Sequence, residues 1–218
     1  MLSEIGMSIL SIVYLILVIG VIKFLWVDRK RHHALLLILI LGLFLDNFVI
    51  AIGIILGEGT LLLYLNLLRF GVHAIFTPFA CLVAYYQVTE FKILDTTKRT
   101  ASYATLSLYL VFVVIGSAQL VGVTYIPELF DGTLRYVTVE SIGPPFGAIG
   151  TIFYVLAIAI LMSRNHSHWL LVGSVIMILG AAIPTSIYGP LPQSIAEVIF
   201  ALGFFMNAQS LSIVKEVV

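Results

Sequence analysis

Apolar runs long enough to cross a lipid bilayer recur along the chain, and they constrain its fold more than any other feature. A membrane-spanning helix needs roughly 20 mostly apolar residues. Of the 218 residues, 61% are hydrophobic and only 10% are charged, which leaves no room for a separate soluble domain. Seven runs of suitable length can be placed: Ser8–Val27, Ala34–Leu56, Phe70–Thr89, Tyr103–Val123, Ile142–Met162, Trp169–Tyr188 and Ser194–Ile213. We therefore expect an all-α integral membrane protein, with one seven-transmembrane-helix bundle over residues 1–218.

The distribution of basic residues predicts the orientation of these helices. In short loops, Lys and Arg accumulate on the cytoplasmic side of a membrane. The connection after the first run contains Arg29–Arg31, and the connection after the third contains Lys92, Lys98 and Arg99. The connections on the other side carry mainly acidic residues. We therefore expect a multi-pass protein with its N-terminus outside and its C-terminus inside, in the cell membrane if the source is prokaryotic.

Two segments depart from a plain helical run. Residues 60–90 form a stretch too long for an upright helix, so we expect a tilt or a break, and Pro78 lies within it. Residues 124–141 form a long outer connection in which Asp131-Gly132 is flanked by β-prone residues. Such a pair is a signal for a tight β-hairpin. The connection is therefore interpreted either as a solvated linker or as a hairpin lid over an outward-facing pocket.

Ionisable side chains inside the apolar runs mark the candidate site. A charged side chain at the bilayer centre costs roughly 2.5–3.5 kcal/mol on insertion scales, so such residues are usually paired, hydrated or functional. At about 1.5 Å per residue from the cytoplasmic end of each run, Asp46 lies near ~18 Å, His73 near ~25 Å and Glu197 near ~24 Å. Arg69 and Thr77 lie one turn either side of His73, on the same helix face. The candidate ligand-binding residues are Asp46, Asn47, Arg69, His73, Thr77 and Glu197.

Each of these residues also has an interpretation without a function. Asp46 could hydrogen-bond to a neighbouring helix together with Asn47, and His73 could be a packed histidine bonded to a backbone carbonyl. Glu197 could lie near the outer headgroups. For Arg69 we expect a position at the outer interface, with the side chain reaching lipid phosphates. The histidines that lie among basic residues are expected at the surface: His32, His33, His166 and His168.

The sequence leaves a metal or cofactor unassigned. Asp, His and Glu are residue types that suit a hard or borderline cation, but here they lie on three different helices without a local ligand motif. The segment Leu-Asp-Asn-Phe-Val-Ile-Ala at residues 45–51 resembles the Asp-Asn segment of TerC-type membrane proteins. Because those proteins are linked to metal-ion handling, the resemblance implies a metal ion as one class of ligand. The last run contains no lysine that could form a Schiff base, so a retinal pigment is not expected.

Three classes of function are compatible with these residues. A small transporter or exchanger of an ion or small solute is favoured, because Asp, Glu and His in series are typical of proton-coupled paths. The alternative is an intramembrane enzyme acting on a lipid or isoprenoid. In that enzyme Asp46 or Glu197 would be the general acid and His73 its partner or base, which makes these three the candidate catalytic residues. The third class is a sensor or structural subunit, in which the polar residues fix helix packing.

The three classes of function predict cavities with different openings, but all three imply the same partners. A pocket closed toward the cytoplasm would favour the enzyme, whereas a polar path continuing to Asn207 would favour transport. The expected partners are membrane lipids and a small-molecule or ion ligand. The formal net charge of zero gives no indication of nucleic acid binding. The sequence does not predict an oligomeric state.

Overall fold

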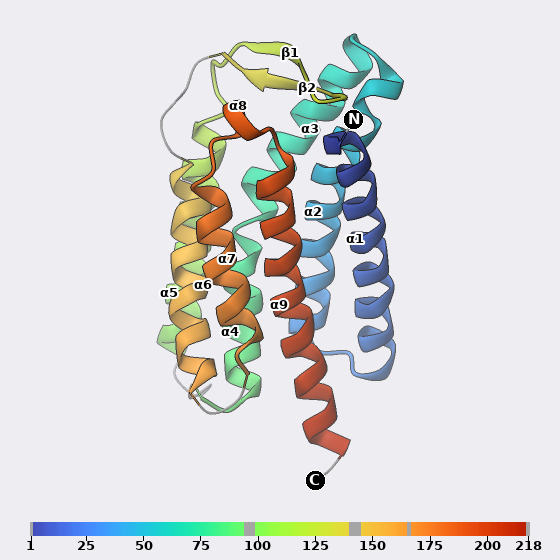
Figure 1. Cartoon of the computed structure of the whole chain (residues 1–218). Coiled ribbons are helices and arrows are strands. Elements are labelled where there is room, and N and C mark those ends of the chain that lie inside the picture. The colour runs from blue at the N-terminus through green and yellow to red at the C-terminus, as the bar shows by residue number, and fades with distance from the viewer. Residues whose placement is uncertain (1, 94–98, 140–144, 165–166, 217–218) are drawn as a thin grey trace.

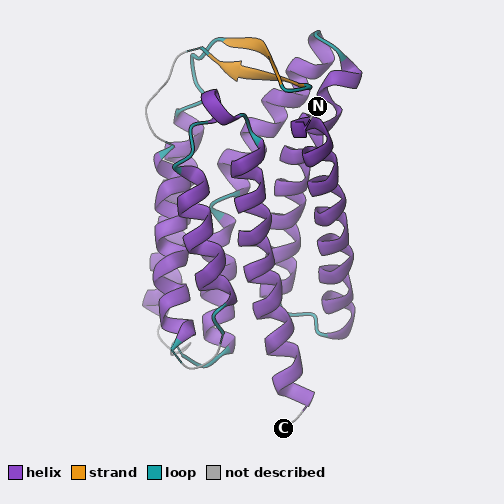
Figure 2. Cartoon of the chain, in the orientation of Figure 1, coloured by secondary structure: helices purple, strands orange, loops and turns teal. Residues whose placement is uncertain are grey.

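Long helices run side by side in a bundle, and a β-hairpin covers one end of it (Figures 1 and 2). The computed structural model describes residues 2–93, 99–139, 145–164 and 167–216. The first half contains α1 (Leu2–Val27), α2 (Arg31–Leu56), α3 (Thr60–Phe76), α4 (Phe79–Glu90) and α5 (Arg99–Ala118). The hairpin strands β1 (Tyr125–Phe130) and β2 (Thr133–Thr138) are followed by α6 (Phe146–Ser163), α7 (Trp169–Ala181), α8 (Thr185–Tyr188) and α9 (Leu191–Glu216).

The helices confirm the predicted class of helical membrane protein. Six helical segments are long and apolar enough to cross a membrane: α1, α2, residues 60–90, α5, α6 and α9. The predicted run Trp169–Tyr188 is different, because α7 ends at Ala181 and Pro184 separates it from the short α8. The 13 residues of α7 extend about 20 Å, less than the hydrocarbon thickness of roughly 30 Å.

We name the two ends of the bundle by what they carry. The hairpin end carries β1 and β2. The opposite end, the basic end, carries the α1–α2 connection, the end of α4 and the start of α5. Among the described residues, the exposed basic ones at this end are Lys23, Arg29, Arg31, Lys92, Arg99 and Arg164. Trp26 and Trp169 are also exposed at this end, by 83% and 54%.

The stretch of residues 60–90 is broken at Thr77 and Pro78, as its length and its proline predict. The amide of Thr77 still donates to the carbonyl of His73 (3.1 Å), which completes the last turn of α3. Pro78 has no N–H to continue this ladder. The chain then restarts as α4, whose first turn is formed by bonds from Ala80 N to Thr77 O and from Cys81 N to Pro78 O (both 3.0 Å).

The hairpin lies where the Asp131-Gly132 pair predicts one. Phe130 pairs with Thr133, which leaves a loop of only these two residues. Their φ angles are 43° and 85°. A two-residue turn with positive φ at both positions is the type I′ turn, which matches the right-handed twist of paired strands.

Three contacts hold this hairpin against the first three helices. At the start of α1, the backbone N and Oγ of Ser3 donate to Asp131 Oδ2 (2.9 and 3.0 Å). On α3, Asn66 Oδ1 accepts a hydrogen bond from the backbone N of Tyr136 (3.2 Å). On α2, a Cβ at Gly53 would lie only 1.8 Å from the carbonyl oxygen of Leu134, so this approach requires glycine. The hairpin is therefore a roof fixed to the bundle.

Glycines also allow α7 and α9 to pack closely. A Cβ at Gly173 would lie 3.0 Å from the carbonyl oxygen of Ile199, and one at Gly203 would lie 2.9 Å from that of Trp169. Small residues permit such close helix contacts in lipid, where burial of apolar surface gives no driving force. The short α7 is thus held along the side of α9.

Two histidines at the basic end are not on the surface, so the expectation for His32 and His33 is wrong. Both are only 1% exposed. They occupy the first turn of α2, where the ring of His33 stacks on Phe24 of α1 (centroids 5.4 Å apart) and its Nδ1 lies 2.8 Å from Asp28 O. Close packing of α1 against α2 covers them, although their sequence neighbours are charged. His168 is exposed as expected, and His166 lies outside the described residues.

Candidate functional site

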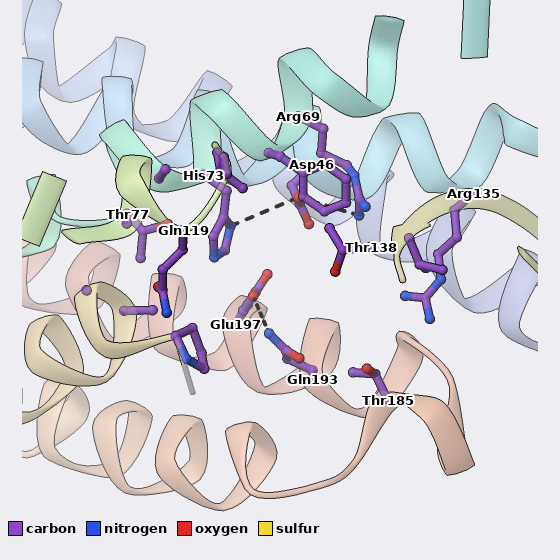
Figure 3. A pocket seen from close by; sticks show the side chains of 18 of the residues that line it. Asp46, Arg69, His73, Thr77, Gln119, Arg135, Thr138, Thr185, Gln193 and Glu197 are labelled. Carbon is purple, nitrogen blue, oxygen red and sulfur yellow. Dashed lines mark hydrogen bonds and ion pairs between the residues drawn. The ribbon is translucent and has the colours of Figure 1, made fainter. Parts of the chain in front are cut away.

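A cavity of about 640 Å³ lies beneath the hairpin. Its walls come from α2, α3, α5, α6, α8 and α9, and β1 and β2 contribute to its roof. Figure 3 shows polar side chains from several of these elements converging on it. The volume falls in the range typical of small-molecule pockets, about 300–1,000 Å³.

Asp46, Arg69 and His73 form one cluster on a wall of this cavity. Arg69 Nη1 lies 3.7 Å from Asp46 Oδ1, and His73 Nδ1 lies 4.0 Å from the same oxygen. Arg69 and His73 are one turn apart on α3, so both can face the carboxylate that α2 presents (Figure 3). The guanidinium also lies over the ring of Phe70, 4.4 Å from its centroid. The aromatic ring and the carboxylate together hold Arg69 inside the bundle.

The position of Arg69 corrects the sequence-based expectation. We expected this side chain at the outer interface, but it is only 5% exposed. Its partner Asp46 is also largely buried, with 13% of the side chain exposed. An ion pair satisfies both charges within the bundle, so neither side chain has to reach the lipid headgroups.

Glu197 faces this cluster from α9. Its carboxylate points toward the side of the cavity where Asp46 and His73 lie (Figure 3), and their charges act on it. The residue is only 5% exposed. Gln193, one turn earlier on α9, donates to Glu197 Oε1 over 3.4 Å. Within the described residues no cation forms a salt bridge with Glu197, which distinguishes it from Asp46.

Three cavity residues have buried polar atoms without a hydrogen-bond partner in the described part of the chain. They are Arg69 Nε, Thr77 Oγ1 and Glu197 Oε2. A buried donor or acceptor left unsatisfied costs about 1–3 kcal/mol. A ligand or water in the cavity that both accepts and donates hydrogen bonds would remove this cost.

A second ion pair lies in the roof, and the sequence analysis missed it. Arg135 Nε and Nη2 donate to Glu128 Oε2 (3.0 and 2.8 Å). These residues are directly opposed in the hairpin register, and both line the cavity. The sequence signal was present, because the turn at Asp131-Gly132 sets which residues of the two strands lie opposite each other.

The structure brings five of the six candidate ligand-binding residues together at the cavity: Asp46, Arg69, His73, Thr77 and Glu197. The sixth, Asn47, is fully buried and is absent from the lining. Its Nδ2 donates to the carbonyl of Leu43 one turn earlier (2.9 Å). Adjacent residues on a helix point about 100° apart, so Asp46 and Asn47 face different surroundings.

No protein-family model matches the chain, and no curated protein is significantly similar to it. Among the residues that the structure describes, no group of three or more His, Cys, Asp and Glu side chains is placed to hold a metal ion.

Toward the basic end, α4 and α9 continue below the cavity with buried apolar side chains. Ala80 and Ala84 of α4 and Ala201 and Phe204 of α9 are all 0% exposed, and α4 packs against α9. Gln87, further along α4, does not line the cavity, and its Nε2 donates to the carbonyl of Phe204 (2.9 Å). The four apolar side chains lie between the cavity and this glutamine along α4 and α9, and we call them the apolar floor.

Asn207 lies beyond this floor. It is fully buried and is absent from the cavity lining. Its Oδ1 accepts a hydrogen bond from Ser167 Oγ, so its carbonyl oxygen is already satisfied. Neither Asn207 nor Gln87 is among the described residues that line the cavity.

Proposed function

We propose that the protein is an intramembrane enzyme that carries out acid–base chemistry on a small lipid or isoprenoid in the hairpin-end cavity. One observation carries the proposal: a buried carboxyl, Glu197, lacks a salt bridge among the described residues and faces the His73–Asp46 pair. A buried carboxyl without a cation favours its protonated form, which can act as a general acid. The same cavity thus offers an acid on α9 and a base on α3.

The Asp46 carboxylate supports the role of His73 as the base. Its Oδ1 lies 4.0 Å from His73 Nδ1, close enough to stabilise an imidazolium by charge but longer than a hydrogen bond. Such contacts often tighten only when substrate is bound. Nδ1 faces Asp46, which leaves Nε2 as the atom that would take a proton from substrate.

The mixed lining supports a substrate with a polar head and an apolar body. Phe70, Phe112 and Leu120 line the cavity beside its ionisable side chains. The ligand also has to accept a hydrogen bond from Arg69 Nε and meet Glu197 Oε2, which donates when it carries the acid proton. Hydroxyl and ester oxygens accept hydrogen bonds, so a membrane-soluble alcohol or its ester suits this site.

The apolar floor on the basic-end side of the cavity favours an enzyme over passage through the protein. A reaction needs one opening, whereas transport needs access from both faces. Transport of an ion or small solute remains the second candidate, because the break at Thr77 and Pro78 lies at the cavity. Interrupted helices beside a binding site are typical of transporters. An outward-facing transporter would also have an apolar floor in that state.

The experiment compares two histidine variants in lipid vesicles that contain a total lipid extract. We expect wild type to convert one lipid species, detected by untargeted mass spectrometry, and His73→Gln to lower that rate by about 10²-fold or more. The control is His168→Gln, which removes an exposed histidine outside the cavity and is expected to keep the wild-type rate. A lipid profile unchanged by wild type, or equal conversion by His73→Gln, would contradict the enzyme.

We also infer that α7 and the segment leading into α8 complete a seventh crossing, with the basic end in the cytoplasm. The exposed basic residues and tryptophans at that end support this orientation. Single cysteines test it, because the native Cys81 is buried. In right-side-out vesicles, a membrane-impermeant maleimide should label Glu58→Cys at the hairpin end directly. It should label Lys92→Cys only after permeabilisation, and the reverse pattern would contradict the orientation.

A further inference from the structure

A second cavity, of about 330 Å³, lies near the basic end between α2, α4 and α5. It shares no lining residue with the hairpin-end cavity. Each helix contributes residues spaced three or four apart, which form one stripe on its surface. These are Arg31, Ala34 and Leu35 of α2, Leu82, Tyr85 and Tyr86 of α4, and Ser102 and Leu106 of α5.

Among the described residues, the charge at this cavity is positive. None of the described residues that line it is acidic. Arg31 is exposed and forms no ion pair with any residue that the structure describes. The preceding Lys30, by contrast, forms ion pairs with both Asp28 and Glu90. The cavity therefore presents the guanidinium of Arg31, unpaired among the described residues, at the end of a membrane-spanning helix.

The remaining lining has a polar and an apolar part. Tyr85, Tyr86 and Ser102 carry hydroxyl groups that can donate to phosphate oxygens. Leu35 and Leu106 each lie about one turn further from the basic end than Arg31 and Ser102, so the apolar wall continues into the membrane. A free phosphate ion would leave this apolar wall unoccupied, whereas a phospholipid would cover it with an acyl chain.

We propose that this cavity is a binding site for one anionic phospholipid, with its phosphate at Arg31 and an acyl chain along the leucines. The guanidinium forms strong charge-assisted hydrogen bonds to phosphate. The site is independent of the chemistry proposed for the hairpin end. It would link α5, which buries little of its surface, to α2 and α4.

Native mass spectrometry tests this site on the full chain, purified with equal amounts of phosphatidylglycerol and phosphatidylcholine. We expect one phosphatidylglycerol to be retained. Arg31→Ala is expected to lower its retention about fivefold, the factor that one basic residue contributes near an anionic membrane surface. The matched control is Arg29→Ala, which removes an exposed charge at the same end, outside the cavity. Equal losses in both variants would overturn the site, because the general charge of the basic end would then explain retention.

A second variant keeps the test valid if Arg31→Ala does not fold. Ala34→Trp leaves the charge unchanged and fills the space at the centre of the α2 stripe, so we expect it to abolish retention. Retention of both lipids by wild type to the same extent would contradict a site selective for anionic lipid. Displacement of the lipid by millimolar inorganic phosphate alone would show that the site binds the free ion. Both results would overturn the proposal.

Discussion

Replacing Arg69 with alanine is expected to lower the free energy of unfolding by about 3–5 kcal/mol, because it leaves a buried carboxylate without its cation. The Asp46 side chain, which is 13% exposed, would face the space left by the guanidinium, 3.7 Å away. Truncation also removes the contact of Arg69 with the ring of Phe70. Reversible unfolding in mixed micelles, followed by circular dichroism, measures the change.

The roof ion pair provides the matched control. Arg135→Ala also removes an arginine from a carboxylate, but the Glu128 side chain is 33% exposed and can be hydrated. Pairs with a solvated partner contribute about 0–1 kcal/mol. The double variant Arg69→Ala/Asp46→Asn should recover part of the stability lost in Arg69→Ala. A loss in Arg69→Ala no larger than that in Arg135→Ala would show that the Asp46 charge is hydrated.

Replacing Glu197 with glutamine is expected to reduce the rate of substrate conversion by about 10²–10⁴-fold, the range for removal of a general acid. Glutamine keeps the shape of the side chain and can still donate a hydrogen bond, but it cannot release a proton. The loss should therefore appear in kcat, with KM little changed. Turnover of the substrate found in the lipid extract, measured over a range of concentrations, separates the two parameters.

Glu58→Gln serves as the control for this change, since it neutralises an exposed glutamate outside the cavity. It should leave both parameters at their wild-type values. A Glu197→Gln variant with unchanged kcat but a raised KM would assign Glu197 to substrate binding alone. The transfer of the proton would then have to come from another group in the cavity.

The rise per residue of a helix predicted that Asp46, His73 and Glu197 lie close together, because counting places the three at similar depths in their apolar runs. Depth along a helix follows from counting residues, and all three also border the same cavity. Pro78 likewise predicted the break, because the missing N–H acts on the local hydrogen-bond ladder. Such local rules transfer directly from sequence to structure.

The environment of Arg69 could not be predicted in this way. Snorkelling is a sound expectation for an arginine near the end of an apolar run, but it assumes lipid on that helix face. Whether the face of α3 that carries Arg69 meets lipid or the Asp46 carboxylate of α2 depends on how α3 is rotated against α2. The sequence analysis missed Gln193 and the Glu128–Arg135 pair for a similar reason. They line the cavity only because segments that are distant in the sequence come together there. Helix rotation and the docking of the hairpin are tertiary properties.

The three attachments of the hairpin have a consequence for the order of assembly during synthesis. Ser3, Gly53 and Asn66, which hold the hairpin, all precede it in the chain. Chains fold from the N-terminus as they are made, so α1, α2 and α3 can be in the membrane before the hairpin emerges. The hairpin can then dock on a finished surface while α6 to α9 are still being translated. The cavity would acquire its roof before its last wall, the one that carries Glu197.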